Sequence, residues 1–150
     1  MGKEFQRIGS VSNAHVGLDF ELKAKLFFEG QGILLTRNHE VMVGIGSIKK
    51  SHRFDLGCAD QKILVECKCH RWTTGNNIPS AKLTVWNEAM FYFYSAPTTY
   101  RKIMFVLKDK RQKSGETLGQ YYVDKFKHLI PTDVELWEYD EMNMDAARIY

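Results

Sequence analysis

A run of five consecutive apolar residues, Ile103 to Leu107 within RKIMFVLK, constrains the fold more than any other stretch of the sequence. In an extended strand successive side chains point to opposite faces, so this run places apolar groups on both faces. Strands that are apolar on both faces belong to sheets that are covered on both sides, usually by helices. The run therefore predicts a central strand over 101–108, in a sheet with helices packed on it.

Helical and extended patterns alternate along the rest of the chain. Apolar residues recur at helical spacing over about 13–29, and the segments 80–95 and 115–130 show helical patterns that end before Pro97 and Pro131. Extended segments lie between them: ILLTRNHEVMVGIG, with two β-rich pieces around a polar RNHE turn, then SHRFDLGC, KILVECKCH and VELWEYD. The final ten residues are expected to form a tail or a short helix. The predicted order is α-β-β-β-α-β-α-β, an α/β fold with a mixed central β-sheet flanked by helices.

The length and composition fit one domain. At 150 residues, with 44% hydrophobic and 13% aromatic residues, the chain can bury its own core, and we expect a single domain over 1–150 with its core at about 13–140. No segment reaches the roughly 20 uninterrupted apolar residues of a membrane span, and the first residues lack the apolar run of a secretory signal. Three cysteines do not form a closed set of disulfides, so we expect reduced thiols and a cytoplasmic protein. The net charge of +3 permits a polyanionic partner without predicting one.

Charged and apolar residues alternate in VECKCH, residues 65–70. If a tight turn lies at 60–61, facing residues have numbers that sum to 121, which places Asp55 opposite Glu66. Lys68 lies two residues further on and shares the face of Glu66. Two carboxylates at about 5 Å repel one another unless a positive charge lies between them, and a divalent cation with oxygen ligands meets this requirement. The alternative is a solvent-facing ion pair between Glu66 and Lys68.

This constellation resembles the PD-(D/E)XK nuclease superfamily, the fold of restriction endonucleases and archaeal Holliday-junction resolvases. The resemblance covers residues 13–108 and rests on a helix, strands that carry FD, ten intervening residues, ECK, and a further helix and strand. Asp55 matches the first acid of the motif, Glu66 the second and Lys68 the lysine, whereas Phe54 stands where many members have proline. The resemblance implies a restriction-endonuclease-like three-layer fold and a metal-dependent endonuclease that hydrolyses the phosphodiester bonds of DNA.

The same resemblance implies roles for individual residues. Asp55 and Glu66, with the backbone carbonyl of Cys67, would hold Mg²⁺, for which Mn²⁺ can substitute, and Lys68 would orient the attacking water. Hydrolysis of this kind leaves a 5′-phosphate. Many members carry an acidic residue on the first helix, and Glu21 in GLDFE is the matching position. Glu21 would bind a second metal or a metal-bound water; its alternative is an ordinary solvated glutamate.

Several cationic and aromatic residues near the motif indicate contacts with nucleic acid. Arg53 shares the predicted face of the first acid, and Arg71, Trp72 and Lys82 surround the polar TTGNN loop, where they would form a DNA-contacting edge. A solvent loop with one tryptophan packed beneath it explains the same residues. The KDKRQK run, residues 108–113, would add sequence-independent attraction for phosphate or would be only a solvated loop.

The cysteines and the aromatic residues allow further interpretations. Cys58, Cys67, Cys69 and His70 would be the ligands of a structural zinc ion, although their spacing favours three small core thiols. A non-catalytic nucleic-acid-binding or scaffold protein with a nuclease-like fold would bind without cutting. We expect a homodimer because cutting both strands of a duplex needs two sites. The aromatic run 91–94 is a candidate interface, and its alternative, which we prefer, is a central helix packed on both sides. No small-molecule cofactor is expected, because the glycine-rich VGIGS lacks the helix and lysine of a phosphate-binding loop.

Overall fold

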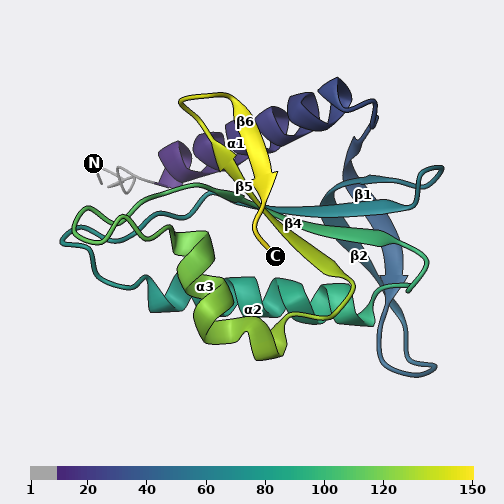
Figure 1. Ribbon diagram of the computed structural model, residues 1–150. Coiled ribbons are helices and arrows are strands. Elements are labelled where there is room, and N and C mark those ends of the chain that lie inside the picture. The colour runs from purple at the N-terminus through teal and green to yellow at the C-terminus, as the bar shows by residue number, and fades with distance from the viewer. Residues whose placement is uncertain (1–9) are drawn as a thin grey trace, which may run out of the picture.

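A six-stranded mixed sheet lies between helices in the computed structural model, which describes residues 10–150 (Figure 1). In chain order the elements are α1 (Ser10–Gly30), β1 (Thr36–Val43), β2 (Lys50–Cys58), β3 (Ile63–Lys68), α2 (Ser80–Ser95), β4 (Arg101–Leu107), α3 (Leu118–Phe126), the short 3-10 helix η1 (Lys127–Leu129), β5 (Val134–Asp140) and β6 (Asp145–Arg148). Helix α1 covers one face of the sheet, and α2 and α3 cover the other. Over these residues the chain has the predicted α/β architecture.

The strands lie side by side in chain order, from β1 to β6. Strands β1, β2 and β3 form an antiparallel meander, β4 and β5 run parallel to β3, and β6 pairs antiparallel with β5. Helix α2 connects β3 with β4, and α3 connects β4 with β5, because parallel neighbours require a crossover. The carboxyl ends of β3, β4 and β5 therefore lie at the same end of the sheet, which we call its carboxyl edge. The loops 69–79 and 108–117 project from it (Figure 1).

Strand β4 is buried on both faces, as its apolar run predicted. Ile103 and Phe105 pack in a core with α1, which we call the α1 core, whereas Met104 and Val106 pack in the α2 core with α2 and α3. Helix α2 contributes the fully buried Trp86 to the second core. Burying a large apolar side chain stabilises a fold by roughly 2 kcal/mol, so the two cores fix all three helices on the sheet.

Most predicted elements are confirmed, with four differences. The helix predicted over 115–130 is shorter, because α3 spans Leu118–Phe126 and the 3-10 helix η1 follows it. Helix α1 begins at Ser10 rather than at about 13. The prediction of a turn at RNHE is wrong, because these residues lie inside β1, an edge strand whose polar side chains are largely exposed. The predicted C-terminal tail instead contains β6, which pairs with β5.

Candidate functional site

The β2–β3 hairpin has the predicted register over its paired part. The facing partners are Leu56 and Val65, Gly57 and Leu64, and Cys58 and Ile63, each with numbers that sum to 121. The ladder ends at the first of these pairs, although both strands continue. Asp55 and Glu66 are the next residues on the two strands, at the point where the ladder opens.

Asp55 occupies an irregular position in β2. Leu56 on one side of it packs in the α1 core, and Phe54 on the other side packs in the α2 core, so two residues that lie two apart face opposite layers. Strand β1 has an irregularity at the same level, at Asn38, whose φ angle is 54°. Asn38 and Asp55 thus form one unpaired position in each strand, an extra residue in the alternation, and the pairs on both sides of them keep the same register, unlike at a β-bulge, where only one strand gains a residue.

The Asp55 carboxylate lies in the gap between β2 and β3. Its Oδ2 atom accepts a hydrogen bond from the backbone N–H of Cys67 at 2.8 Å, and the side chain is half-buried. The carboxylate oxygen takes the position of the carbonyl oxygen that a regular antiparallel ladder would supply. The regular pair of Asp55 and Glu66 on one face, which the sequence predicts, is therefore replaced by a carboxylate that points at the edge of β3.

Glu66 and Lys68 point from β3 toward the layer of α2. Glu66 is the sheet neighbour of Met104, and Lys68 is the neighbour of Val106, and both of these apolar residues belong to the α2 core. Glu66 is only 7% exposed, and the Nζ atom of Lys68 lies 3.4 Å from its Oε2 atom. The alternative of a solvent-facing ion pair is therefore wrong, because the carboxyl group is buried.

Burial raises the pKa of the Glu66 carboxyl from 4.5 to about 8, and the nearby Asp55 carboxylate adds to the rise. The Lys68 ammonium and the backbone amide of Asp55 lower this pKa by smaller amounts. A buried carboxyl of this kind keeps its proton at neutral pH unless a positive charge compensates it. A divalent cation between Asp55 and Glu66 would allow both groups to ionise.

Glu21 approaches the same point from α1. Burial and then the Asp55 carboxylate raise the pKa of Glu21, whereas Arg37 and Lys68 lower it. The Oε2 atom of Glu21 accepts hydrogen bonds from Arg37, at 2.9 Å from Nη2 and 3.3 Å from Nε. Glu21 therefore lies within electrostatic range of Asp55 and Lys68, as its predicted role requires, but an arginine of β1 binds its carboxylate.

The oxygen donors at this point suit a hard divalent cation. The carboxyl groups of Asp55 and Glu66 lie near each other where the β2–β3 ladder opens, and the backbone N–H of Cys67 binds Asp55. Magnesium is usually held by one or two carboxylates, while water and phosphate oxygens complete its octahedral shell. Among the side chains that the structure describes, no group of three or more His, Cys, Asp or Glu is placed to hold a metal ion.

Two histidines lie between this cluster and α2, and the sequence did not predict this position for either of them. His52 stacks on Tyr92 with ring centroids 3.6 Å apart, and burial lowers its pKa from 6.5. His70 accepts a hydrogen bond at Nδ1 from the indole N–H of Trp86 at 2.7 Å, and burial with two nearby lysines lowers its pKa to about 4. Both imidazoles are therefore neutral at pH 7. The alternation of side chains along a strand could have predicted these positions. Residues two apart face the same side, and each histidine lies two residues from another residue that faces α2.

The cysteines and His70 lie on opposite sides of the sheet. Cys58, Cys67 and Cys69 are free thiols that pack against the α1 core, whereas His70 contacts α2. Burial raises the pKa of the Cys67 thiol, which disfavours the thiolate that zinc requires. The arrangement matches three small core thiols rather than a zinc site.

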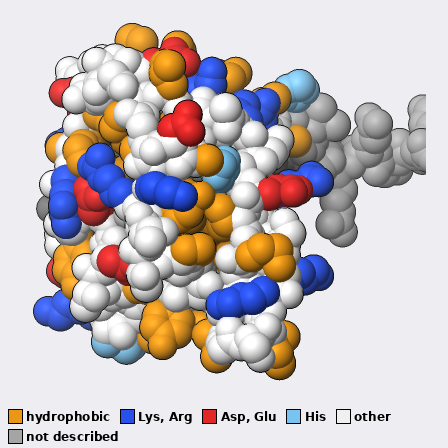
Figure 2. Space-filling model, turned by 90° about the vertical axis from the view of Figure 1, so that its right-hand side faces the viewer, with side chains coloured by type: hydrophobic (Ala, Val, Ile, Leu, Met, Phe, Trp, Pro, Cys, Tyr) orange, Lys and Arg blue, Asp and Glu red, His pale blue; other side chains and the backbone are white. Residues whose placement is uncertain are grey.

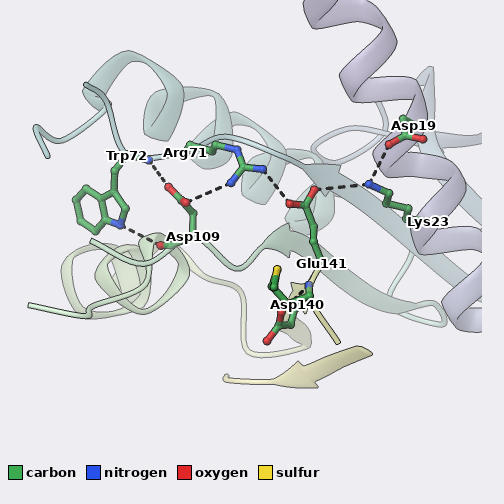
Figure 3. A network of polar contacts seen from close by, with 8 residues as sticks. Asp19, Lys23, Arg71, Trp72, Asp109, Asp140 and Glu141 are labelled. Carbon is green, nitrogen blue, oxygen red and sulfur yellow. Dashed lines mark hydrogen bonds and ion pairs between the residues drawn. The ribbon is translucent and has the colours of Figure 1, made fainter. Parts of the chain in front are cut away.

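The predicted nucleic-acid contacts fall in different environments. Arg53 is exposed and pairs with a glutamate of β1 at 2.8 Å. Arg71 lies between Asp109, at 3.3 Å, and Glu141, at 3.0 Å (Figure 3). Lys82 is exposed near the start of α2. Arg53 and Lys82 are thus accessible to a ligand, whereas both acids hold Arg71 in place.

Trp72 is packed against the protein. It is 9% exposed; its backbone N–H donates to Oδ2 of Asp109 at 2.8 Å, and its indole N–H donates to the Asp109 carbonyl oxygen at 3.0 Å (Figure 3). The guanidinium carbon of Arg111 lies 4.5 Å from the centre of the Trp72 ring. This is the arrangement of the alternative interpretation, a loop with a tryptophan packed beneath it.

A separate cavity lies near the amino ends of β4 and β5. It has a volume of about 830 Å³, and its walls include Phe91, Tyr94 and Leu129. Lys102, which is 1% exposed, lines it and binds Asp133 at 2.7 Å. Figure 2 shows apolar side chains in patches between lysines and arginines on this side of the molecule. The predicted catalytic residues are not part of this cavity.

Comparison with models of known protein families, with curated proteins and with solved structures finds no match for this chain. Over the residues that the structure describes, no helix has the length and apolarity needed to cross a membrane. What the cluster at Asp55, Glu66 and Lys68 can do is therefore judged from its own geometry.

Proposed function

We propose that the chain is a Mg²⁺-dependent deoxyribonuclease with a fold of the PD-(D/E)XK kind. The observation that carries the proposal is the meeting of Asp55, in the gap between β2 and β3, with the buried pair of Glu66 and Lys68. The element order, the mixed sheet and the approach of Glu21 from the opposite layer also support it. The substrate in this proposal is DNA, and Mn²⁺ is expected to replace Mg²⁺.

Each residue of the cluster has a role in phosphodiester hydrolysis. Asp55, Glu66 and the Cys67 carbonyl would hold the metal ion, which when bound supplies a Lewis acid and a water of lowered pKa. The hydrogen bond from the Cys67 N–H fixes the Asp55 carboxylate, so that this ligand needs little reorientation. Lys68 orients the attacking water and offsets the negative charge that develops on the phosphate. Glu21 would hold a second ion or a water bound to the first.

Stability alone does not explain this cluster. A buried ion pair is often no more stabilising than apolar residues of similar volume. Glu66 is nonetheless buried beside a second carboxylate, with one lysine as its partner. A function that needs both acids, such as binding a divalent cation, accounts for the arrangement better than packing does.

Cleavage assays with several DNA structures test the proposal. The purified protein is incubated with supercoiled plasmid, linear duplex, single-stranded DNA and a four-way junction, in Mg²⁺, Mn²⁺ or EDTA. We expect cleavage with either metal and none in EDTA, and Lys68→Ala should lower the rate by roughly a hundredfold or more. Lys25→Ala is the matched control, because Lys25 also pairs with a glutamate, Glu29, at 3.2 Å, but lies outside the cluster.

The possible outcomes separate the alternatives. Cleavage at an unchanged rate by Lys68→Ala would contradict the role of the lysine. DNA that is bound tightly but never cut, with either metal, would favour the non-catalytic alternative. Cleavage of RNA in preference to every DNA substrate would replace DNA as the proposed substrate.

A further inference from the structure

Two loops at the carboxyl edge of the sheet form one surface. The loop 69–79 connects β3 with α2, and the loop 108–117 connects β4 with α3. Arg111 of the second loop donates two hydrogen bonds to the Asn76 carbonyl oxygen in the first, at 2.7 and 3.0 Å. We call these two loops, together with Lys82 near the start of α2, the basic ledge. The contacts of Arg111 hold the ledge in a single arrangement.

A network of polar contacts anchors the ledge to the rest of the fold (Figure 3). Trp72 binds Asp109 through its backbone and its indole N–H, which joins the two loops a second time. Arg71 connects Asp109 with Glu141, which follows β5, and Glu141 contacts Lys23 of α1 at 3.6 Å. The ledge is therefore fixed to α1 and to the end of β5.

The charge that the ledge presents to solvent is positive. Lys82, Lys110 and Lys113 are exposed, and none of them forms an ion pair with another residue in the described part of the chain. The two loops contain only two acids, Asp109 and Glu116. Against these two acids the ledge has six lysines and arginines, so its net charge is positive.

The ledge begins where the candidate active site ends. Lys68 is the last residue of β3, and Trp72 lies four residues further along the chain. Four extended residues span at most about 14 Å. The start of the ledge therefore lies within about 14 Å of Lys68.

Lys82 of the ledge and Lys68 of the candidate site both act electrostatically on His70, which places Lys82 near the acids. From this placement we infer that the basic ledge binds the phosphodiester backbone of nucleic acid, without reading its sequence, and guides the strand to the acids. The inference rests on the proposed function for the destination of the strand, whereas binding itself is separable from cleavage. Lysines that neutralise phosphates release counterions, so the affinity falls steeply with salt. A ledge that is already assembled also avoids the entropy cost of ordering loops on binding.

Salt-dependent binding of a labelled duplex measures the contribution of the ledge. Fluorescence anisotropy in EDTA, from about 50 to about 300 mM salt, gives the slope of log affinity against log salt. If Lys110 and Lys113 each neutralise one phosphate, the double variant Lys110→Gln/Lys113→Gln lowers this slope by about 1.8 and the affinity at 0.1 M salt by about 60-fold. The control Lys50→Gln/Lys127→Gln removes two exposed lysines outside the ledge and should leave both values unchanged.

Two results would overturn the inference. The first is a salt slope and an affinity that stay unchanged in Lys110→Gln/Lys113→Gln, or in the second variant, Lys113→Glu. This result counts only when the melting temperature and circular dichroism show that the variant is folded. The other is equally tight binding of the unaltered protein to polyglutamate or to phosphatidylserine vesicles, since an acidic protein or a membrane would then fit as well. An inactive protein that still binds DNA through these lysines would reject the nuclease proposal and support the ledge.

Discussion

Replacing Glu66 with glutamine should raise the free energy of unfolding of the metal-free protein at neutral pH. Burial and the Asp55 carboxylate raise the pKa of this carboxyl from 4.5 to about 8. Between these values the folded protein holds a proton that the unfolded chain releases, so the free energy of unfolding falls as the pH rises through this window. Glutamine fills a similar volume without titrating, and it therefore removes the loss.

The expected gain follows from the width of this window. Each pH unit above 4.5 costs the folded protein about 1.4 kcal/mol while Glu66 stays protonated, which amounts to about 3 kcal/mol at pH 7. The charges of Asp55 and Lys68 also act on Glu66, which reduces the part that a single substitution recovers. We expect Glu66→Gln to gain about 2 kcal/mol at pH 7 and little near pH 4.5.

Urea unfolding followed by tryptophan fluorescence, between about pH 5 and pH 8, measures the effect in EDTA. Magnesium should reverse the order of stability, because a ligand at a hundredfold excess over its dissociation constant stabilises the unaltered protein by about 2.7 kcal/mol. Glu66→Gln should gain little from Mg²⁺. Glu138→Gln is the matched control, since Glu138 of β5 is also 7% exposed and has a pKa raised by burial, but lies outside the cluster. This variant should keep the response to Mg²⁺.

The reasoning is refuted if Glu66→Gln and the unaltered protein show the same pH dependence of unfolding in EDTA. Glu66 would then ionise in the folded protein as easily as in the unfolded chain. Equal stabilisation of both proteins by Mg²⁺ would show instead that the cation binds elsewhere.

Three further predictions test other contacts. Asp55→Asn keeps an oxygen that can accept the Cys67 N–H, so it should lower the cleavage rate roughly a hundredfold while shifting the melting temperature less than Asp55→Ala does. Asp133→Asn leaves the buried Lys102 ammonium without its counter-ion, so it should lower the free energy of unfolding, measured by urea unfolding, by about 2 kcal/mol. Lys102→Met should lower this free energy by less. The pKa of His70 is lowered to about 4, so the unfolded chain binds a proton before the folded protein does as the pH drops below 6.5. The free energy of unfolding should therefore fall by about 2 kcal/mol between pH 6.5 and pH 4, and urea unfolding should show a smaller fall in His70→Gln.

Local rules allowed the sequence to predict much of the fold. The short turn between β2 and β3 sets the predicted register of the three pairs from Leu56 with Val65 to Cys58 with Ile63, whereas the irregular position of Asp55, just beyond the last pair, was not predicted. The apolar run of β4 identified the central strand because only a strand covered on both faces can bury it. Predictions that depended on one period, one turn or one helix were mostly correct.

Contacts between distant parts of the chain could not be predicted from the sequence. Arg71 meets Asp109 and Glu141, which lie 38 and 70 residues away, and no local pattern marks such partners. The irregularity at Asn38 and Asp55 is equally hard to see, because both extra residues are polar and fit the polar segments around them. Polarity in the sequence indicates exposure or a turn as readily as it indicates a carboxylate held between two strands.

The extra residues of β1 and β2 limit the ways in which the Asp55 carboxylate can be removed without disturbing the two cores. Removal of both Asn38 and Asp55 would leave Leu56 and Phe54 adjacent and still facing opposite layers, so the cores would survive without the acid. Removal of only one would shift all later residues of that strand by one place against their partners and turn apolar side chains to the wrong layer. A single substitution at Asp55 removes the carboxylate without changing the length or the register of either strand. We therefore expect the lengths of β1 and β2 to be kept even where the acid is lost.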